Sequence, residues 1–414
     1  MRAVLFTNVQ VFDGTGAAPF AGEVRVEGAR ITALGGGGAP PLARADAQIV
    51  DGRGGTLMPG LVEAHAHLSW PSSVERLVPG MMLPHDELVL TTARNARILL
   101  DHGFTSAYSA GALGKTVEMA LKAQIDSGGL PGPRLVPSTI ERAPPTDDER
   151  LKTADIEDHV RGPEAMRAFV SDCARIGAKS VKLLLSGEDA LQPGSSQTLL
   201  YTEDEVRAAG EQARASGVWL TGHAQAAAAV KLGVRHGFRV LYHCSYADAE
   251  ALDLLESRKH EIFYGPAVGI VQATLDAQPP PQFDMTAMKV SAAEVLELQQ
   301  RLVPELRRRG LRVLPGGDYG FPFNPNGRNA RDLELFVRHF GYTPAAAMSA
   351  ATQLGGELMG LGQELGLVRE GYLADLLLVD GDPTVDVRVL QDKTRLRAIM
   401  QNGRFYKAPD AWPA

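Results

Sequence analysis

The sequence contains little cysteine: only Cys173 and Cys244 occur among its 414 residues. Two cysteines cannot build a disulfide framework, which excludes the small disulfide-stabilised secreted domains. Long apolar runs are also absent, and no stretch reaches the roughly 20 residues that a membrane-spanning helix needs. The N-terminus MRAVLFTNVQVFDG lacks the charged and apolar segments of a signal peptide. These absences predict a soluble, cytoplasmic protein without a membrane partner.

Basic charge is not in excess either. The formal net charge is −7 at pH 7, and the sequence carries no basic stripe. Nucleic acid is therefore not an expected partner. The hydrophobic share of 44% and the charged share of 22% are those of an ordinary globular protein. The length fits an α/β barrel with an appended domain.

From Leu61 onward, short apolar strands alternate with segments of helical periodicity. Eight strands are expected, at LVEAHAHL, FTSAYSA, PRLVPST, SVKLLLS, VWLTGHA, RVLYHCSYA, EIFYGPA and RVLPGGDYG. Helices are expected between most of them, at 87–102, 164–176, 203–216 and 293–309. Many of the helical segments end on a glycine that can adopt the left-handed conformation: Gly103, Gly177, Gly217, Gly237 and Gly310. Such units predict an α/β fold in which a (β/α)8 TIM barrel spans residues 58–362.

Both ends of the chain have the pattern of short strands. Residues 3–12 and 24–34 alternate apolar and polar side chains around turn residues, and the tail from Gly366 to Lys407 returns to strands and turns. We expect the two ends to meet in one small β-sandwich domain, made of residues 1–57 and 363–414.

Chemically versatile side chains fall at corresponding places on the expected strands. In a barrel of this kind, chemistry takes place at the carboxyl ends of the strands. His65 and His67 are two residues apart on the first strand, so both face the same side. Further candidates end the fourth, fifth, sixth and eighth strands: Lys182, His223, His243 and Asp318. A single strand histidine is often a hydrogen-bonded core residue, but core histidines have no reason to select the same end of several strands.

Imidazole and carboxylate groups are the ligands that suit Zn²⁺ or a related transition metal. Lys182 stands in the apolar run SVKLLLSG, where a buried ammonium would be costly. One interpretation is that its tip reaches water at the end of the strand. The other is that its neutral amine adds CO₂ and becomes a carbamate, an anion able to bridge two metal ions. The surrounding histidines favour the carbamate.

These motifs resemble those of the amidohydrolase superfamily, in the branch of the imidazolonepropionase-like proteins and Xaa-Pro dipeptidases. The resemblance covers nearly the whole chain and rests on PGLVEAHAHL, SVKLLLSG, WLTGHAQ, LYHCSYAD, LPGGDYG and the C-terminal EGYLADLLLVDGDPTVDV. It implies that His65, His67 and Asp318 hold one metal ion and that His223 and His243 hold the other. Carboxylated Lys182 and a hydroxide would bridge the two ions.

The chain departs from this family in two places. Relatives commonly carry a segment rich in glycine and histidine after the third strand, where this chain reads STIERAPPTDDER. Relatives also tend to have glycine after the sixth-strand histidine, where Cys244 follows here. Both stretches would lie near the mouth of the barrel, so the resemblance does not identify the substrate.

The predicted activity is hydrolysis of an amide C–N bond by the metal-bridging hydroxide, with Asp318 passing a proton to the leaving group. An N-acyl amino acid, a dipeptide and an aryl amide are the expected small-molecule substrates, and a homo-oligomer is expected. The same centre could also attack a lactone, an ester, a cyclic amide or a phosphoester. A deaminase is disfavoured, because Ala226 stands where such enzymes usually carry a glutamate. A non-catalytic scaffold is disfavoured because every expected ligand is present.

Residues at strand ends and in the loops after them are the candidates for substrate binding. An arginine facing the site could clamp a substrate carboxylate with two hydrogen bonds, which would favour an N-acyl amino acid or a dipeptide. Aromatic side chains there would suit an aryl or bulky acyl group. The candidates are His85, Tyr108, Ser138, Arg142, Tyr246, Tyr319 and Arg328, with Met81 and Met82 beside His85.

Overall fold

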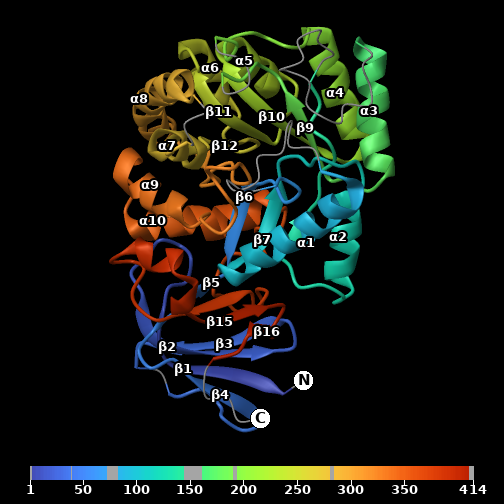
Figure 1. Cartoon of the computed structure of the whole chain (residues 1–414). Helices are drawn as coiled ribbons and strands as arrows, with labels where there is room; N and C mark the ends of the chain where they lie inside the picture. The colour runs from blue at the N-terminus through green and yellow to red at the C-terminus, as the bar shows by residue number, and fades with distance from the viewer. Residues whose placement is uncertain are drawn as a thin grey trace.

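A computed structural model describes residues 2–38, 40–71, 83–143, 161–189, 194–279 and 284–409. The protein is a mixed α/β structure with two parts (Figure 1). A β part formed by the two ends of the chain lies at one end of the molecule, and an α/β part with parallel strands makes up the rest.

The β part brings together strands from both chain ends, as the sequence predicts. Its strands are linked in one sheet in the order β16-β15-β14-β5-β1-β2-β3, and β4 also pairs with β1. The link between the two ends is the antiparallel pairing of β14 with β5, in which Leu376 lies opposite Pro59. The strands are β1 (Ala3–Val11), β2 (Phe20–Glu27), β3 (Arg30–Gly36), β4 (Ala47–Asp51), β5 (Thr56–Pro59), β14 (Leu376–Val379), β15 (Leu396–Gln401) and β16 (Arg404–Lys407).

The α/β part contains all eight strands that the sequence predicts. They form two parallel sheets, β6-β7-β8 and β9-β10-β11-β12-β13. Isolated parallel bridges join the sheets, Ser138 with Ser180 on one side and Ala66 with Tyr319 on the other. The strands are β6 (Leu61–Ala66), β7 (Phe104–Ser109), β8 (Arg134–Val136), β9 (Ser180–Leu184), β10 (Trp219–Ala226), β11 (Val240–Tyr246), β12 (Phe263–Gly265) and β13 (Arg312–Val313).

Helices connect these strands and pack outside them (Figure 1). They are α1 (His85–Asp101), α2 (Val117–Asp126), α3 (Pro163–Arg175), α4 (Glu203–Ser216), α5 (Ala227–Arg235), α6 (Ala249–Ser257), α7 (Val268–Asp276), α8 (Thr286–Arg308), α9 (Arg331–Phe340), α10 (Pro344–Ser349) and α11 (Gly355–Leu358), with a π-helical turn at Ala350–Leu354. The glycines predicted to end helices all have positive φ angles; for Gly217, after α4, the angle is 68°. Glycine adopts this conformation without steric cost and turns the chain back toward the sheet.

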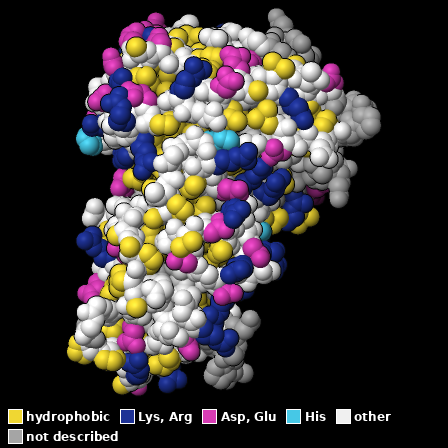
Figure 2. Space-filling model, turned by 90° about the vertical axis from the view of Figure 1, so that its left-hand side faces the viewer, with side chains coloured by type: hydrophobic (Ala, Val, Ile, Leu, Met, Phe, Trp, Pro, Cys, Tyr) yellow, Lys and Arg dark blue, Asp and Glu magenta, His cyan; other side chains and the backbone are white. Residues whose placement is uncertain are grey.

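The interior of the α/β part is packed with side chains. Tyr108, Tyr242 and Phe263 are fully buried on the inner side of the strands together with Val62 and Leu314. The polar residues at the strand ends therefore lie next to a layer of buried, mainly apolar side chains. On the face shown in Figure 2, acidic and basic side chains are interspersed. None of the described helices combines the length and the apolar character that crossing a membrane requires.

Candidate metal centre

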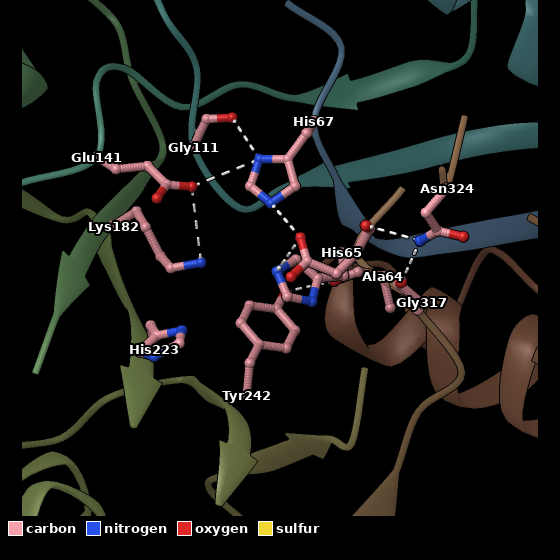
Figure 3. Close-up of polar contacts among 12 residues, drawn as sticks. Ala64, His65, His67, Gly111, Glu141, Lys182, His223, Tyr242, Gly317 and Asn324 are labelled. Atoms are coloured by element: carbon pink, nitrogen blue, oxygen red, sulfur yellow. Dashed lines mark hydrogen bonds and ion pairs between the residues drawn. The ribbon is translucent and has the colours of Figure 1, made fainter. Parts of the chain in front are cut away.

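The first group of candidate ligands comes from the end of β6 and the chain after β13. The Nε2 atoms of His65 and His67 both face Oδ1 of Asp318, at 3.5 Å and 2.9 Å (Figure 3). All three residues are buried. His65 and Asp318 are 253 positions apart in the sequence. They meet because the chain after β13, the last strand of the α/β part, lies beside β6, the first. Their ligand atoms all lie within 4.8 Å of one another, close enough to share one metal ion.

The backbone around Asp318 is unusual, and glycines make it possible. Asp318 has a φ angle of 58°, which is uncommon for a residue with a side chain. Asn324 stabilises this conformation by donating hydrogen bonds to the carbonyl oxygens of Gly317 and Asp318, at 2.8 Å and 2.9 Å. A Cβ atom at Gly316 would lie 2.9 Å from the backbone nitrogen of His65. The motif LPGGDYG therefore allows the close approach that brings Asp318 to the histidines.

The second group of candidate ligands lies on β10 and β11. His223 and His243 are buried, with ring centroids 4.4 Å apart. Glu188 joins them: its Oε2 lies 3.5 Å from Nε2 of His223, and the ligand atoms of the three residues fall within 4.8 Å of one another. His243 and Cys244 both have positive φ angles, 70° and 50°. Such conformations in residues other than glycine concentrate at functional sites.

Lys182 lies between the two groups and is not at the surface. Only 2% of its side chain is exposed, so the interpretation in which its tip reaches water is excluded. Its Nζ atom lies 5.0 Å from the centre of the Tyr242 ring and 3.9 Å from Oε1 of Glu141 (Figure 3). The six predicted ligands are therefore brought together at one end of the parallel strands.

The environment favours the protonation states that metal binding requires. Burial lowers the pKa of His223 to about 4 and lowers the pKa values of His65 and His243 well below the usual range. Burial alone would raise the pKa of Asp318, but the facing histidines His65 and His67 hold it far below its ordinary value. At neutral pH His65, His223 and His243 are neutral and Asp318 is an anion, the forms in which they bind metals.

Neighbouring groups hold the ring of His65 in place. Its imidazole stacks on Tyr242, with centroids 3.6 Å apart and the planes inclined by 14°. The hydroxyl of Tyr242 donates a hydrogen bond to the carbonyl oxygen of Ala64. The backbone nitrogen of His65 donates to Oε1 of Glu63 at 2.9 Å, and Asn329 donates to the other oxygen of Glu63 at 2.7 Å. These contacts preorganise the ligand, as outer residues commonly do in metal sites.

The donor set fits divalent metal ions. Imidazole nitrogens and carboxylate oxygens match the ligands of zinc. Oδ1 of Asp318, which faces Nε2 of both histidines, is buried without a hydrogen bond of acceptable geometry among the described residues, a cost that a metal ion would offset.

The model of the Amidohydrolase family matches residues 56–406. The chain belongs to the amidohydrolase family.

This amidohydrolase is similar to several characterised proteins. Ochratoxinase from Aspergillus niger is 24% identical over 253 residues, which cover 61% of this chain and 51% of that protein, so the match spans about half the length of this curated relative. Many solved structures share the fold. One is a Xaa-Pro dipeptidase with bound methionine in the active site, with a TM-score of 0.84 and 23% identity over 98% of this chain and 100% of that chain. Others are A. niger ochratoxinase, with a TM-score of 0.81 and 20% identity over 99% of this chain and 96% of that chain, and phenylurea hydrolase B, with a TM-score of 0.76 and 21% identity over 97% of this chain and 96% of that chain.

Four of the predicted substrate residues are buried and packed against other elements of the fold: Arg142, Ser138, Tyr108 and Tyr319. Arg142 is buried against α3, where its guanidinium lies 4.8 Å from the centre of the Phe169 ring and donates a hydrogen bond to the carbonyl oxygen of Ala165 at 3.2 Å. Ser138 donates to the carbonyl oxygen of Ser180 at 2.9 Å, linking β8 to β9. The structure thus assigns both side chains to packing between elements.

Tyr108 is also part of the packed interior. Its hydroxyl lies 2.9 Å from Oγ1 of Thr221, two residues before His223 on β10. Because residues two apart share a face, Tyr108 lies one layer of side chains below the candidate ligands. Tyr319 is fully buried and donates a hydrogen bond to Oδ1 of Asp332 at 2.8 Å, behind the segment that carries Asp318.

The other substrate candidates are more accessible. Tyr246 is half-buried at the end of β11, where burial, with Glu294 and Asp189 nearby, raises its pKa to about 12. His85 is exposed at the start of α1, and Arg328 is exposed in the loop before α9. Met81 and Met82 lie outside the described residues. Among these, Tyr246 stays the best candidate for a substrate contact.

Three residues beside the candidate centre were not predicted from the sequence: Glu141, Glu188 and Trp70. The alternation of side-chain directions in extended chain could have predicted Glu141. Ser138 and Arg142 point to one side of the segment, so the side chain of Glu141 points to the other. Glu188 follows the fourth strand in the sequence, but no local pattern predicts that it lies beside His223. Trp70 packs against His67 with ring centroids 4.1 Å apart. No local pattern indicated that contact, since it depends on the turn after β6.

Replacement of Arg142 by alanine tests its reassignment. We expect Arg142→Ala to lower the free energy of unfolding by about 1–3 kcal/mol, because the contact with Phe169 and the hydrogen bond to Ala165 are lost. KM should not change. Denaturant unfolding and steady-state kinetics measure the two effects. The exposed Arg328→Ala serves as the control and should change stability by less than about 0.5 kcal/mol. A large increase in KM with unchanged stability would return Arg142 to the substrate site.

Proposed function

We propose that this amidohydrolase cleaves an amide C–N bond in a small molecule with the help of two divalent metal ions. One observation carries the proposal: His65, His67, Lys182, His223, His243 and Asp318 are buried together at the carboxyl ends of parallel strands. A hydrogen-bonded core would not need so many ionisable groups in one place. The names of the relatives, ochratoxinase, Xaa-Pro dipeptidase and phenylurea hydrolase, support hydrolysis as the reaction class.

The residues divide into two sets in this proposal. His65, His67 and Asp318 would hold one metal ion, and His223 and His243 the other, with Lys182 between them as a carbamate. Metal ions bound here would lower the pKa of water and polarise the scissile carbonyl group. Asp318 would accept the proton of the attacking water and deliver it to the leaving nitrogen. Its strongly lowered pKa in the protein alone supports an anionic carboxylate, the form that binds a metal ion.

The surroundings support a substrate with an aromatic or bulky apolar group. Trp70 lies against His67, and Phe321 packs edge-on against Trp70 with ring centroids 4.5 Å apart. Leu83 and Leu113 belong to the same apolar cluster. Neither Arg142 nor Arg328 supports a carboxylate clamp, because the first faces α3 and the second is exposed in a loop. Among the proposed substrates, an amide with an aryl or bulky acyl group therefore fits better than a dipeptide.

A substrate screen tests the reaction class. Zinc-loaded protein is incubated with N-acyl amino acids, dipeptides, aryl amides, cyclic amides, lactones, esters and phosphotriesters, and the products are measured. We expect turnover of amides, with aryl amides hydrolysed fastest. Turnover of lactones, esters or phosphotriesters without any amide would contradict the proposal.

Several finer points belong to the same proposal. The parallel bridges between the two sheets support a closed (β/α)8 barrel over residues 58–362, and the sheet shared by the chain ends supports a β-sandwich domain of residues 1–57 and 363–414. Zinc is the proposed metal because of the histidine and carboxylate donors. The cytoplasmic location and the homo-oligomeric state stay predictions.

A further inference from the structure

Glu141 is a carboxylate beside the candidate metal centre that the proposed reaction does not use, and only 13% of its side chain is exposed. It follows β8 on a segment of extended chain. Parallel bridges pair Ile140 with Ala112 and Arg142 with Leu183, on either side of this segment. Arg142 points outward to α3, so alternation directs Glu141 to the opposite side, toward Lys182 and His67. Figure 3 shows the carboxylate of Glu141 between these two side chains.

The surrounding backbone is shaped to admit this side chain. Gly111, just after β7, has a φ angle of 125°. A Cβ atom at this position would lie 2.2 Å from Cγ and 2.5 Å from Oε1 of Glu141. The backbone beside Glu141 is also fixed, since the nitrogen of Arg142 donates to the carbonyl oxygen of Lys182 at 3.1 Å. The backbone on both sides of Glu141 therefore determines where its carboxylate lies.

The contacts of Glu141 connect two candidate ligands. Oε1 lies 3.5 Å from Nδ1 of His67 and 3.9 Å from Nζ of Lys182. Nδ1 of His67 also lies 3.1 Å from the carbonyl oxygen of Gly111. The other ring nitrogen, Nε2, faces Asp318 at 2.9 Å. His67 thus directs Nε2 toward the candidate metal position, while Nδ1 faces a carbonyl oxygen and a carboxylate.

We propose that Glu141 is a positioning residue for the metal centre. With the Gly111 carbonyl, its carboxylate keeps the proton of His67 on Nδ1, which leaves Nε2 free to bind the metal and raises its strength as a ligand. Carboxylates and carbonyls behind a metal-bound histidine do this in many proteins, and their removal typically costs about 10–100-fold in metal affinity. The inference rests on the proposed metal centre of this protein.

Chelator competition tests the proposal without relying on activity. Wild-type protein, Glu141→Gln and Glu205→Gln are loaded with Zn²⁺ and equilibrated with increasing concentrations of a chelator, and bound metal is counted at each step. We expect Glu141→Gln to release one metal ion at about 10–100-fold lower chelator concentration than wild type and to keep the other as wild type does. Gln has nearly the same size, so a cavity does not cause the loss.

Glu205→Gln is the matched control. Glu205 is a buried carboxylate that caps α4 by accepting hydrogen bonds from the backbone nitrogens of Thr202 and Gly162, both at 2.8 Å. Its replacement should lower the melting temperature but leave both metal affinities unchanged. A metal affinity of Glu141→Gln equal to that of wild type would overturn the positioning role and leave the metal centre intact. Wild-type protein that binds no metal would instead overturn the proposed function.

A second variant covers the case in which Glu141→Gln does not fold. Glu141→Asp keeps the charge but moves it back by one methylene group. We expect it to release the same metal ion at a lower chelator concentration than wild type and to keep the other metal ion as wild type does. Release of both metal ions together, or of neither below the wild-type concentration, would contradict a role centred on His67.

Discussion

Replacing Asp318 by asparagine is expected to lower kcat by about 10²–10⁴-fold while the protein stays folded. Asparagine still offers an oxygen atom to a metal ion, but it cannot accept a proton. Asn is also among the residues that best tolerate the left-handed conformation, and Asp318 has a φ angle of 58°. Steady-state kinetics on the substrate found in the screen measures the effect.

Two further measurements isolate the chemical role of Asp318. Metal content and melting temperature of Asp318→Asn should stay close to those of wild type, because Asn324 still holds the backbone through the carbonyl oxygens of residues 317 and 318. A variant that keeps more than half of the wild-type kcat would exclude Asp318 as the group that transfers the proton. A variant that loses its metal would show a structural role instead.

Replacing Lys182 by alanine is expected to leave a protein that binds one metal ion or none and is nearly inactive. An unmodified ammonium beside two divalent cations would be repelled, whereas a carbamate supplies the bridging anion. Short carboxylic acids added to Lys182→Ala should restore part of the activity by occupying the place of the carbamate. Metal analysis after gel filtration and kinetics with and without added acid are the measurements.

Lys179→Ala is the control for this experiment. Lys179 lies three residues earlier, at the entry of β9, is half-buried, and donates a hydrogen bond to the carbonyl oxygen of Gly217. Its Nζ atom lies 4.7 Å from the centre of a ring of Trp219. This variant should keep its metals and its activity. Two tightly held metal ions in Lys182→Ala would rule out the bridging role.

The structure adds one consideration to the argument for a carbamate. β9 itself carries no acidic residue, but Glu141 reaches Lys182 from the segment after β8, with Oε1 at 3.9 Å from Nζ. A carboxylate that could compete for the bridging position therefore exists in the fold. Its side chain lies against Gly111, with Oε1 at 3.5 Å from Nδ1 of His67, which favours a role behind the histidine rather than between two metal ions.

The amino-acid sequence by itself determined the order of the strands and helices and the candidate ligands. Both depend on local patterns: runs of apolar residues bounded by glycines, two histidines spaced to share one face of a strand, and polar residues repeated at strand ends. The family assignment follows from the same motifs, and the match over residues 56–406 confirms it.

Only the tertiary structure decided which side chains surround those ligands. Arg142 and Glu141 are neighbours in the sequence, yet one packs against α3 and the other lies beside Lys182, because the pairing with flanking strands determines which face turns inward. Gly111, where the missing Cβ leaves space for Glu141, lies 30 residues earlier, just after β7. Local spacing contains no information about such contacts, since they form only when strands distant in sequence come together in space.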